Sequence, residues 1–101
     1  MKNIAEFKKS LEKDRPESNM SVQLRALWYD AKGDWYTAHN QVDHLEDIAS
    51  ARIHAYLHRK EGDIWNADYW YAKAGEKRPQ LSLDQEWEEL VERFLSKANH
   101  V

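Results

Sequence analysis

The sequence predicts an all-α protein built from five or six antiparallel helices, and three observations lead to this prediction. The chain of 101 residues contains only three glycines and two prolines, and all five stand where a helix can end or a loop can turn. Apolar residues recur at steps of three and four, the spacing of one helix face. No strand-like alternation is sustained. A chain of this length has room for one domain, which we expect to span residues 1–101.

Two helices are predicted in the first third of the chain. The first covers residues 3–13 and is broken before Pro16, because proline disfavours helical backbone in the residue that precedes it. Ser18 or Asn19 can cap the second helix, which stops at Gly33. The inner face of this second helix is marked by apolar side chains at helical spacing: Met20, Leu24, Leu27, Trp28 and Ala31.

Two more helices are predicted between Gly33 and Gly62, joined to each other and to the second helix by short connections. Asp34 can cap a third helix over residues 35–46. Asp47 or Ser50 can cap a fourth, which ends at Gly62. Apolar residues at helical spacing mark the inner faces of both helices: Trp35, Ala38, Val42 and Leu45 in the third, and Ala49, Ile53, Tyr56 and Leu57 in the fourth.

The last two predicted helices also carry their own start signals. Asp63 caps the fifth, which ends before Gly75, and Ser82 and Gln85 form a capping box that begins the sixth. We expect the inward side chains of the fifth helix to be Ile64, Ala67, Tyr71 and Ala74. Those of the sixth are Trp87, Leu90, Val91, Phe94, Leu95 and Ala98. The solvated face of the sixth is expected to hold its glutamates: Glu86, Glu88, Glu89 and Glu92.

The sequence repeats itself at an offset of 29 residues. Four pairs of identical residues then coincide: Ala26 with Ala55, Gly33 with Gly62, Asp34 with Asp63, and Ala38 with Ala67. Glycine ends one helix, aspartate caps the next, and alanine lets the two helix axes approach closely. The sequence therefore predicts two helical hairpins of the same kind.

The second hairpin resembles a known repeat family. Residues 62–67, Gly-Asp-Ile-Trp-Asn-Ala, are followed by Tyr69, Tyr71 and the Lys-Ala pair at 73–74, and together they resemble the second half of a tetratricopeptide repeat. Residues 33–38, Gly-Asp-Trp-Tyr-Thr-Ala, are a weaker copy. The offset of 29 residues departs from the family's usual period of about 34.

The resemblance implies a helical scaffold for protein interactions. Residues 54–71 are also similar to small helical proteins with no assigned activity, a similarity that supports the fold and implies no reaction. Two repeats do not bury a continuous core by themselves. We therefore expect the terminal helices to act as caps, or a second copy of the chain to cover the open face as a homodimer.

Charge and composition exclude several classes of protein. Fifteen basic and eighteen acidic residues give a net charge of -3 with no basic stripe, unlike a nucleic-acid binder. No run of about 20 apolar residues is present to cross a membrane. The absence of cysteine fits a reducing compartment. Because Glu6, Lys8 and Lys9 interrupt the apolar positions of the N-terminal segment, we expect no signal peptide and a cytoplasmic protein.

Three histidines form a candidate metal site. His54 and His58 are four residues apart, so their rings project from the same side of the fourth predicted helix. If the third and fourth helices pack as an antiparallel hairpin, His39 lies opposite them. Three imidazoles with Asp43 or Glu61 nearby can hold zinc and leave a position for water. The alternative is that these are boundary histidines, each hydrogen-bonded to a neighbouring carboxylate or carbonyl.

Tryptophan and tyrosine are abundant, with five of each. On the fifth predicted helix, Trp65, Tyr69 and Trp70 lie off the inward stripe. Their rings either wedge between helices or form an exposed surface for a protein or peptide partner, because tryptophan and tyrosine are the residues that most often anchor interfaces.

The sequence contains no glycine-rich phosphate loop and no Gly-x-Ser-x-Gly motif, so it assigns no catalytic residues. It predicts a protein-interaction or structural module of tetratricopeptide-like type that needs no cofactor. The alternative prediction is a small metal-binding protein, or a metal-dependent enzyme, that uses the histidine cluster to hold zinc.

Overall fold

The computed structural model describes residues 2–99, which form six α-helices and no strand. The predicted all-α class with five or six helices is therefore confirmed. The helices are α1 (Ile4–Ser10), α2 (Val22–Ala31), α3 (Trp35–Val42), α4 (Ile48–Glu61), α5 (Ile64–Lys73) and α6 (Leu83–Asn99). Residues 1, 100 and 101 of the predicted domain lie outside the described residues.

Glycine–aspartate turns connect α2 to α3 and α4 to α5. Gly33 and Gly62 have φ angles of +84° and +90°, a left-handed conformation that glycine adopts without the steric cost of a Cβ atom. The aspartates that follow, Asp34 and Asp63, accept hydrogen bonds at 3.1 and 3.2 Å from amides in the first turn of the next helix. The predicted helix ends and caps at both turns are confirmed.

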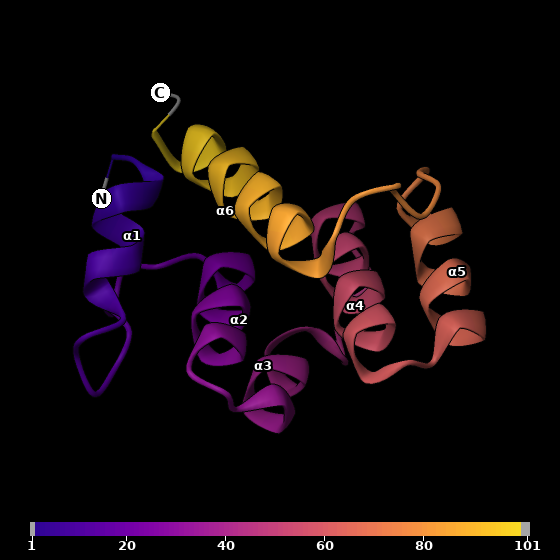
Figure 1. Cartoon of the computed structure of the whole chain (residues 1–101), viewed down its shortest axis with the longest axis horizontal. Helices are drawn as coiled ribbons and strands as arrows, with labels where there is room; N and C mark the ends of the chain where they lie inside the picture. Colours follow the sequence, from indigo (N-terminus) through magenta and orange to yellow (C-terminus); the bar gives the residue numbers. More distant parts are fainter. Residues whose placement is uncertain (1, 100–101) are drawn as a thin grey trace.

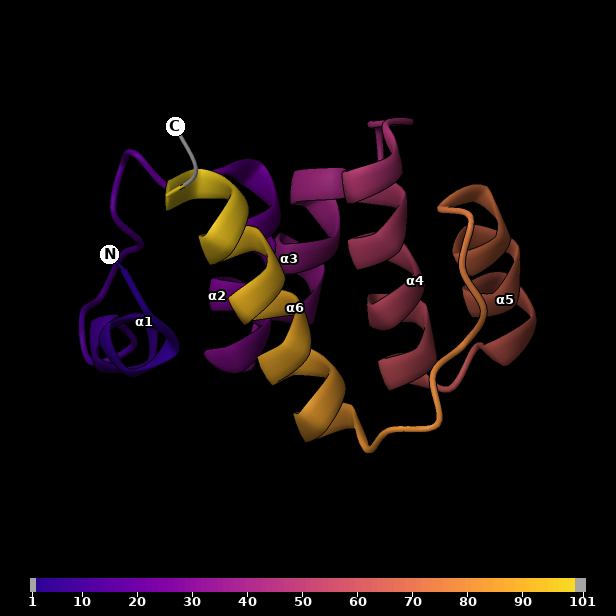
Figure 2. The same cartoon turned by 90° about the horizontal axis from the view of Figure 1, so that it is seen from above.

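Helices α2 to α5 follow one another in space as they do in the chain, each packed on the next (Figure 1). Helix α6 returns toward α1 and packs against α1, α2 and α4 (Figure 2). Helix α5 stands at the far end from α1 and packs on α4 (Figures 1 and 2). Helix α4 is therefore central, because α3, α5 and α6 all lie against it.

The core lies where α6 meets the earlier helices. Its largest fully buried apolar side chains come from five helices: Phe7, Leu27, Trp28, Val42, Ile53, Tyr56, Leu57, Leu90 and Val91. Three indole N–H groups that turn inward find acceptors at 2.8–3.2 Å: Trp28 on the Ser10 hydroxyl, Trp35 on the Leu57 carbonyl and Trp87 on the Leu27 carbonyl. Much of the tryptophan content is thus core, with each polar tip satisfied as burial requires.

Two predicted helix ends are wrong. Helix α1 ends at Ser10, because residues 11–13 continue with tighter hydrogen bonds between residues three apart. Helix α3 ends at Val42 instead of residue 46. After the Asp43 amide bonds to the His39 carbonyl, the Leu45 amide bonds to the Val42 carbonyl three residues back, so the helix gives way to a turn before Asp47 caps α4.

One predicted cap is also wrong. Helix α2 is capped by Ser21 and not by Ser18 or Asn19. The Ser21 hydroxyl accepts a hydrogen bond at 3.2 Å from the backbone amide of Leu24, in the first turn of the helix. The capping box at the start of α6 is confirmed: Gln85 accepts from the Ser82 amide at 3.0 Å, and Ser82 accepts from the Gln85 amide at 3.1 Å.

The prediction that Glu86 faces solvent is wrong, because its side chain is fully buried. Arg59 donates to Glu86 Oε1 at 2.6 Å, and the Tyr71 hydroxyl donates to Oε2 at 2.5 Å. A second guanidinium nitrogen, from Arg52, lies 2.9 Å from Oε2. A buried carboxylate is tolerated only where cations and hydrogen bonds replace its hydration. This group ties α6 to both helices of the α4–α5 hairpin.

Asp30 is a second buried carboxylate. It accepts from the Tyr56 hydroxyl and from Lys60 Nζ, both at 2.8 Å, and so fastens α2 to α4. Burial, reinforced by the adjacent carboxylate, raises the pKa of Tyr56. The hydroxyl therefore remains a hydrogen-bond donor throughout the pH range in which the protein is handled.

Candidate metal centre

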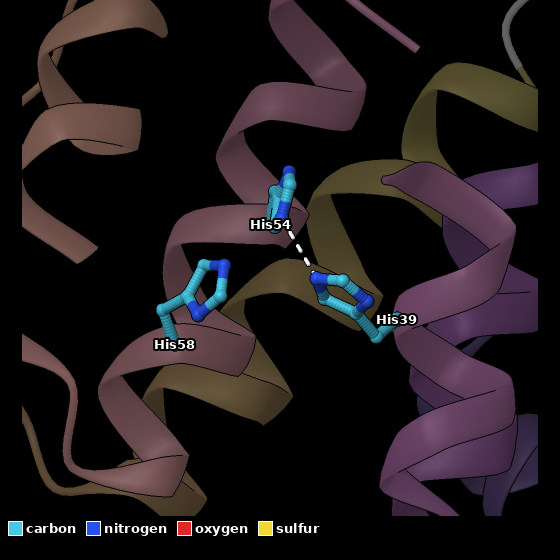
Figure 3. A group of neighbouring side chains, drawn as sticks. All are labelled: His39, His54 and His58. Atoms are coloured by element: carbon cyan, nitrogen blue, oxygen red, sulfur yellow. Dashed lines mark hydrogen bonds between the residues drawn. The ribbon is translucent and has the colours of Figure 1, made fainter. Parts of the chain in front are cut away.

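The structure brings the three predicted histidines together. His39 comes from α3, while His54 and His58 stand one turn apart on α4, and one ring nitrogen of each lies within 4.8 Å of the others. The Nε2 atoms of His39 and His54 are 3.0 Å apart. Figure 3 shows the ring of His58 turned with its own Nε2 toward the other two. The antiparallel packing of α3 on α4 creates this convergence.

The spacing of two of these nitrogens, those of His39 and His54, is close to that of ligands on one metal ion. Two imidazole nitrogens on a tetrahedral zinc, with Zn–N bonds of about 2.0–2.1 Å, stand about 3.3 Å apart. The His39–His54 separation of 3.0 Å is slightly shorter. The ring nitrogen of His58 lies within 4.8 Å of the other two, so the three rings must adjust to reach one ion.

Carboxylates lie on the outer nitrogens of two of the rings. Glu61 Oε1 is 2.8 Å from Nδ1 of His58, and Asp43 Oδ2 is 3.8 Å from Nδ1 of His39. A carboxylate that accepts the outer N–H of a histidine fixes its tautomer and makes the inner nitrogen a better metal ligand. The sequence placed Asp43 and Glu61 near the cluster, and the structure puts them behind the rings.

Two tryptophans lie against the cluster. Trp35 stacks on His39 with ring centroids 4.8 Å apart, and Trp70 stacks on His54 at 4.1 Å. His54 and His58 stack on each other at 4.7 Å. The rings therefore form a continuous aromatic group from α3 across α4 to α5, which restricts the rotation of each imidazole.

The electrostatics favour neutral imidazoles. Burial lowers the pKa of His54 to about 4, assisted by the nearby His58 and His39. Burial and His58 also lower the pKa of His39. Both rings are consequently uncharged at neutral pH, which is the form that binds a metal. The outer nitrogen of His54, Nδ1, is buried and has no hydrogen-bond partner among the described residues.

This pKa shift predicts acid sensitivity of the protein without metal. Between pH 6.5 and about 4 the unfolded chain protonates residue 54 and the folded chain does not, so stability falls as the pH falls. We expect a loss of about 2 kcal/mol between pH 7 and 5 from His54, with His39 acting in the same direction. Urea unfolding in the presence of EDTA at several pH values measures this loss. In His54→Gln the free energy of unfolding should depend less on pH, and in His44→Ala its pH dependence should be unchanged. An unchanged pH dependence in His54→Gln would show that His54 is not its source.

The three aromatic candidates on α5 are placed differently from one another. Trp65 is 79% exposed and Tyr69 is 48% exposed, and their rings are nearly parallel, 6.4 Å apart. Trp70 is partly buried against His54 and belongs to the histidine group. Ile64, predicted to face inward, is 38% exposed, because α5 packs on α4 through Ala67 and Tyr71.

Sequence reasoning missed two features of this site. It identifies the histidines but not the aromatic rings that enclose them, since it assigns Trp35 to the core and leaves Trp70 either between helices or on an exposed surface. A usable signal was present: Trp35 is one turn before His39 on the same helix, where side chains four apart meet. The contact of Trp70 with His54 depends on helix packing and has no local signal.

No protein-family model, curated protein or solved structure matches this chain. The tetratricopeptide resemblance therefore remains a prediction. Within residues 2–99 the helices are too short or too polar to cross a bilayer.

Proposed function

We propose that this protein binds a divalent transition metal of the zinc class through His39, His54 and His58. The observation that carries the proposal is the meeting of three imidazoles from two helices, with a 3.0 Å separation between the Nε2 atoms of His39 and His54. Imidazole nitrogen is a preferred ligand of zinc and of the neighbouring first-row metals.

The surroundings of the cluster support metal binding over a purely structural role. Without metal, the Nε2 atoms of His39 and His54 share one hydrogen bond at 3.0 Å, so only one of the two rings carries a proton there. Boundary histidines would satisfy every buried ring nitrogen with a protein partner, whereas the buried Nδ1 of His54 has none among the described residues. Asp43 and Glu61 supply two negative charges on the outer side of the rings, which offset the charge of a divalent cation held between three neutral imidazoles.

The experiment is a titration of the purified chain with Zn²⁺ in competition with a chromophoric chelator. The proposal predicts one tight site per chain. His44 lies on the turn that follows α3, is exposed and is not one of the three grouped histidines, and it contacts Asp43 at 3.2 Å, so His44→Ala should still bind one zinc per chain. Binding that disappears in His44→Ala, or that is absent in the natural sequence, would contradict the proposal.

Glu61 provides a second test. Replacing it with glutamine keeps its size and removes the charge beside Nδ1 of His58. We expect zinc affinity to fall by about 10–100-fold, the usual effect of losing a carboxylate behind a histidine ligand. The same competition titration measures it, with exposed Glu46→Gln as the matched control. Equal affinities for the natural sequence and Glu61→Gln would show that this carboxylate does not support the site.

A second candidate function, protein interaction, is favoured by the exposed pair of Trp65 and Tyr69. Both project from α5, which stands at the end of the helix row, and a second copy of the chain is the simplest partner for this face. Sedimentation velocity of the natural sequence and of a Trp65→Ala, Tyr69→Ala double variant tests the idea. A dimer that dissociates in the variant supports it, and a monomer at every concentration of the natural sequence rules the homodimer out.

A further inference from the structure

Among the histidine and carboxylate side chains that the structure describes, the centre gathers three imidazoles. Asp43 and Glu61 approach the outer Nδ1 atoms, on the far side of the rings from Nε2. Among residues 2–99, no other histidine, aspartate or glutamate groups with all three imidazoles at ligand distances. Trp35 and Trp70 occupy the adjacent space, and an indole nitrogen is a donor of hydrogen bonds with no lone pair for a metal.

A tetrahedral ion on this centre would therefore lack one ligand from the protein. Zinc sites closed by four protein ligands are structural, whereas sites with three keep a position for water or a substrate. The centre also reaches solvent, since 22% of the His39 side chain is accessible while His54 is only 4% exposed. A small molecule can approach the ion on the His39 side.

The charges around the centre favour a neutral fourth ligand. Three neutral imidazoles leave the +2 charge of the ion uncompensated in the inner shell. The carboxylates of Asp43 and Glu61, behind two of the rings, already supply two negative charges. An anion bound to the ion would add a third negative charge to the two carboxylates. The lysine that stands over these rings, Lys73, lies over Trp70, with Nζ 5.1 Å from the ring centroid.

We propose that the metal held by His39, His54 and His58 keeps one exchangeable coordination position, open on the His39 side, which takes a small neutral donor such as water or an imidazole-type nitrogen. The inference rests on the proposed metal site. With this open position the metal can bind a ligand from solution, which a structural ion closed by four protein ligands cannot do. Exchange at this position moves no electrons and breaks only the bond from the ion to the departing water.

The test uses the full chain loaded with Co²⁺, whose visible absorption bands respond to each ligand. Imidazole and azide are titrated separately, and the metal content of the protein is measured after each addition to show that the ion is retained. The proposal predicts that imidazole shifts the bands in a saturable way with cobalt still bound, and at lower concentration than azide does. Glu61→Gln, whose site is expected to be weaker, is measured at a cobalt concentration that keeps it loaded and should then show the same shift, which excludes Glu61 as a hidden fourth ligand.

The other outcomes overturn the proposal at different points. Bound cobalt whose bands respond to neither ligand would mean a closed coordination shell. Saturation by azide at lower concentration than imidazole would refute the preference for a neutral donor. Bands that respond only in Glu61→Gln would show that this carboxylate fills the position. Failure to bind cobalt or zinc at all would refute the metal site itself, and this inference with it.

Discussion

Glu86→Ala is expected to lower the free energy of unfolding by about 3–5 kcal/mol, the cost of leaving buried partners of an ion pair without their counter-charge. The substitution removes the acceptor of the Tyr71 hydroxyl and of Arg59. It also takes away one of the two carboxylates of Arg52, which is itself buried and then keeps only Glu76, 3.1 Å from its Nε atom. Urea unfolding followed by far-ultraviolet circular dichroism measures the change in stability.

Two further variants make this result interpretable. Glu92 lies on the same helix and is exposed, so Glu92→Ala should change stability by no more than about 0.5 kcal/mol. Glu86→Gln keeps an acceptor for one partner and removes the charge, and should give an intermediate loss. A typical domain is stable by only about 5–15 kcal/mol, so the loss in Glu86→Ala can be enough to unfold the protein. In that case the smaller loss expected in Glu86→Gln still provides the test. A loss in Glu86→Ala as small as that in Glu92→Ala would contradict the buried network.

His39→Ala is expected to weaken zinc binding by more than about 100-fold, since removing a ligand costs more than removing the carboxylate behind it. His39 is the most accessible of the three ligands, and α3 holds its position through other buried side chains, Ala38 and Val42. The fold should therefore survive the change. Thermal unfolding without metal checks this point.

Tryptophan emission offers an independent measurement of the same effect. Trp35 and Trp70 lie within 5 Å of two ligand rings, measured between ring centroids, so bound Co²⁺ should quench their fluorescence. The quenching should saturate in the natural sequence and in His44→Ala and should be lost in His39→Ala. Retention of tight binding in His39→Ala would mean that the ion is held elsewhere.

Local signals in the sequence were sufficient to predict the helical hairpins. Gly33 and Gly62 with their following aspartates act within one turn of backbone, so their effect can be read without knowledge of the packing. The same holds for the capping box at Ser82. The meeting of His39 with α4 follows from one further step, the antiparallel packing of a hairpin partner.

The role of Glu86 could not be predicted in this way. Its neighbours on α6 include other glutamates, so composition suggests a solvated face. However, Leu90 follows it by one turn and is buried, which places residue 86 at the edge of the inward stripe. Its compensating charges come from Arg52 and Arg59, more than 25 positions away in the sequence. Such a pairing depends on the tertiary packing, which local patterns do not encode.

The central claim, that three imidazoles from α3 and α4 share one ion, is tested most directly by X-ray absorption at the zinc edge. The chain is dialysed against zinc, freed of excess metal and measured together with its metal content. The structure predicts one zinc per chain with three imidazole nitrogens at about 2.0–2.1 Å. A zinc content near zero, or a shell with fewer than three imidazoles, would contradict it.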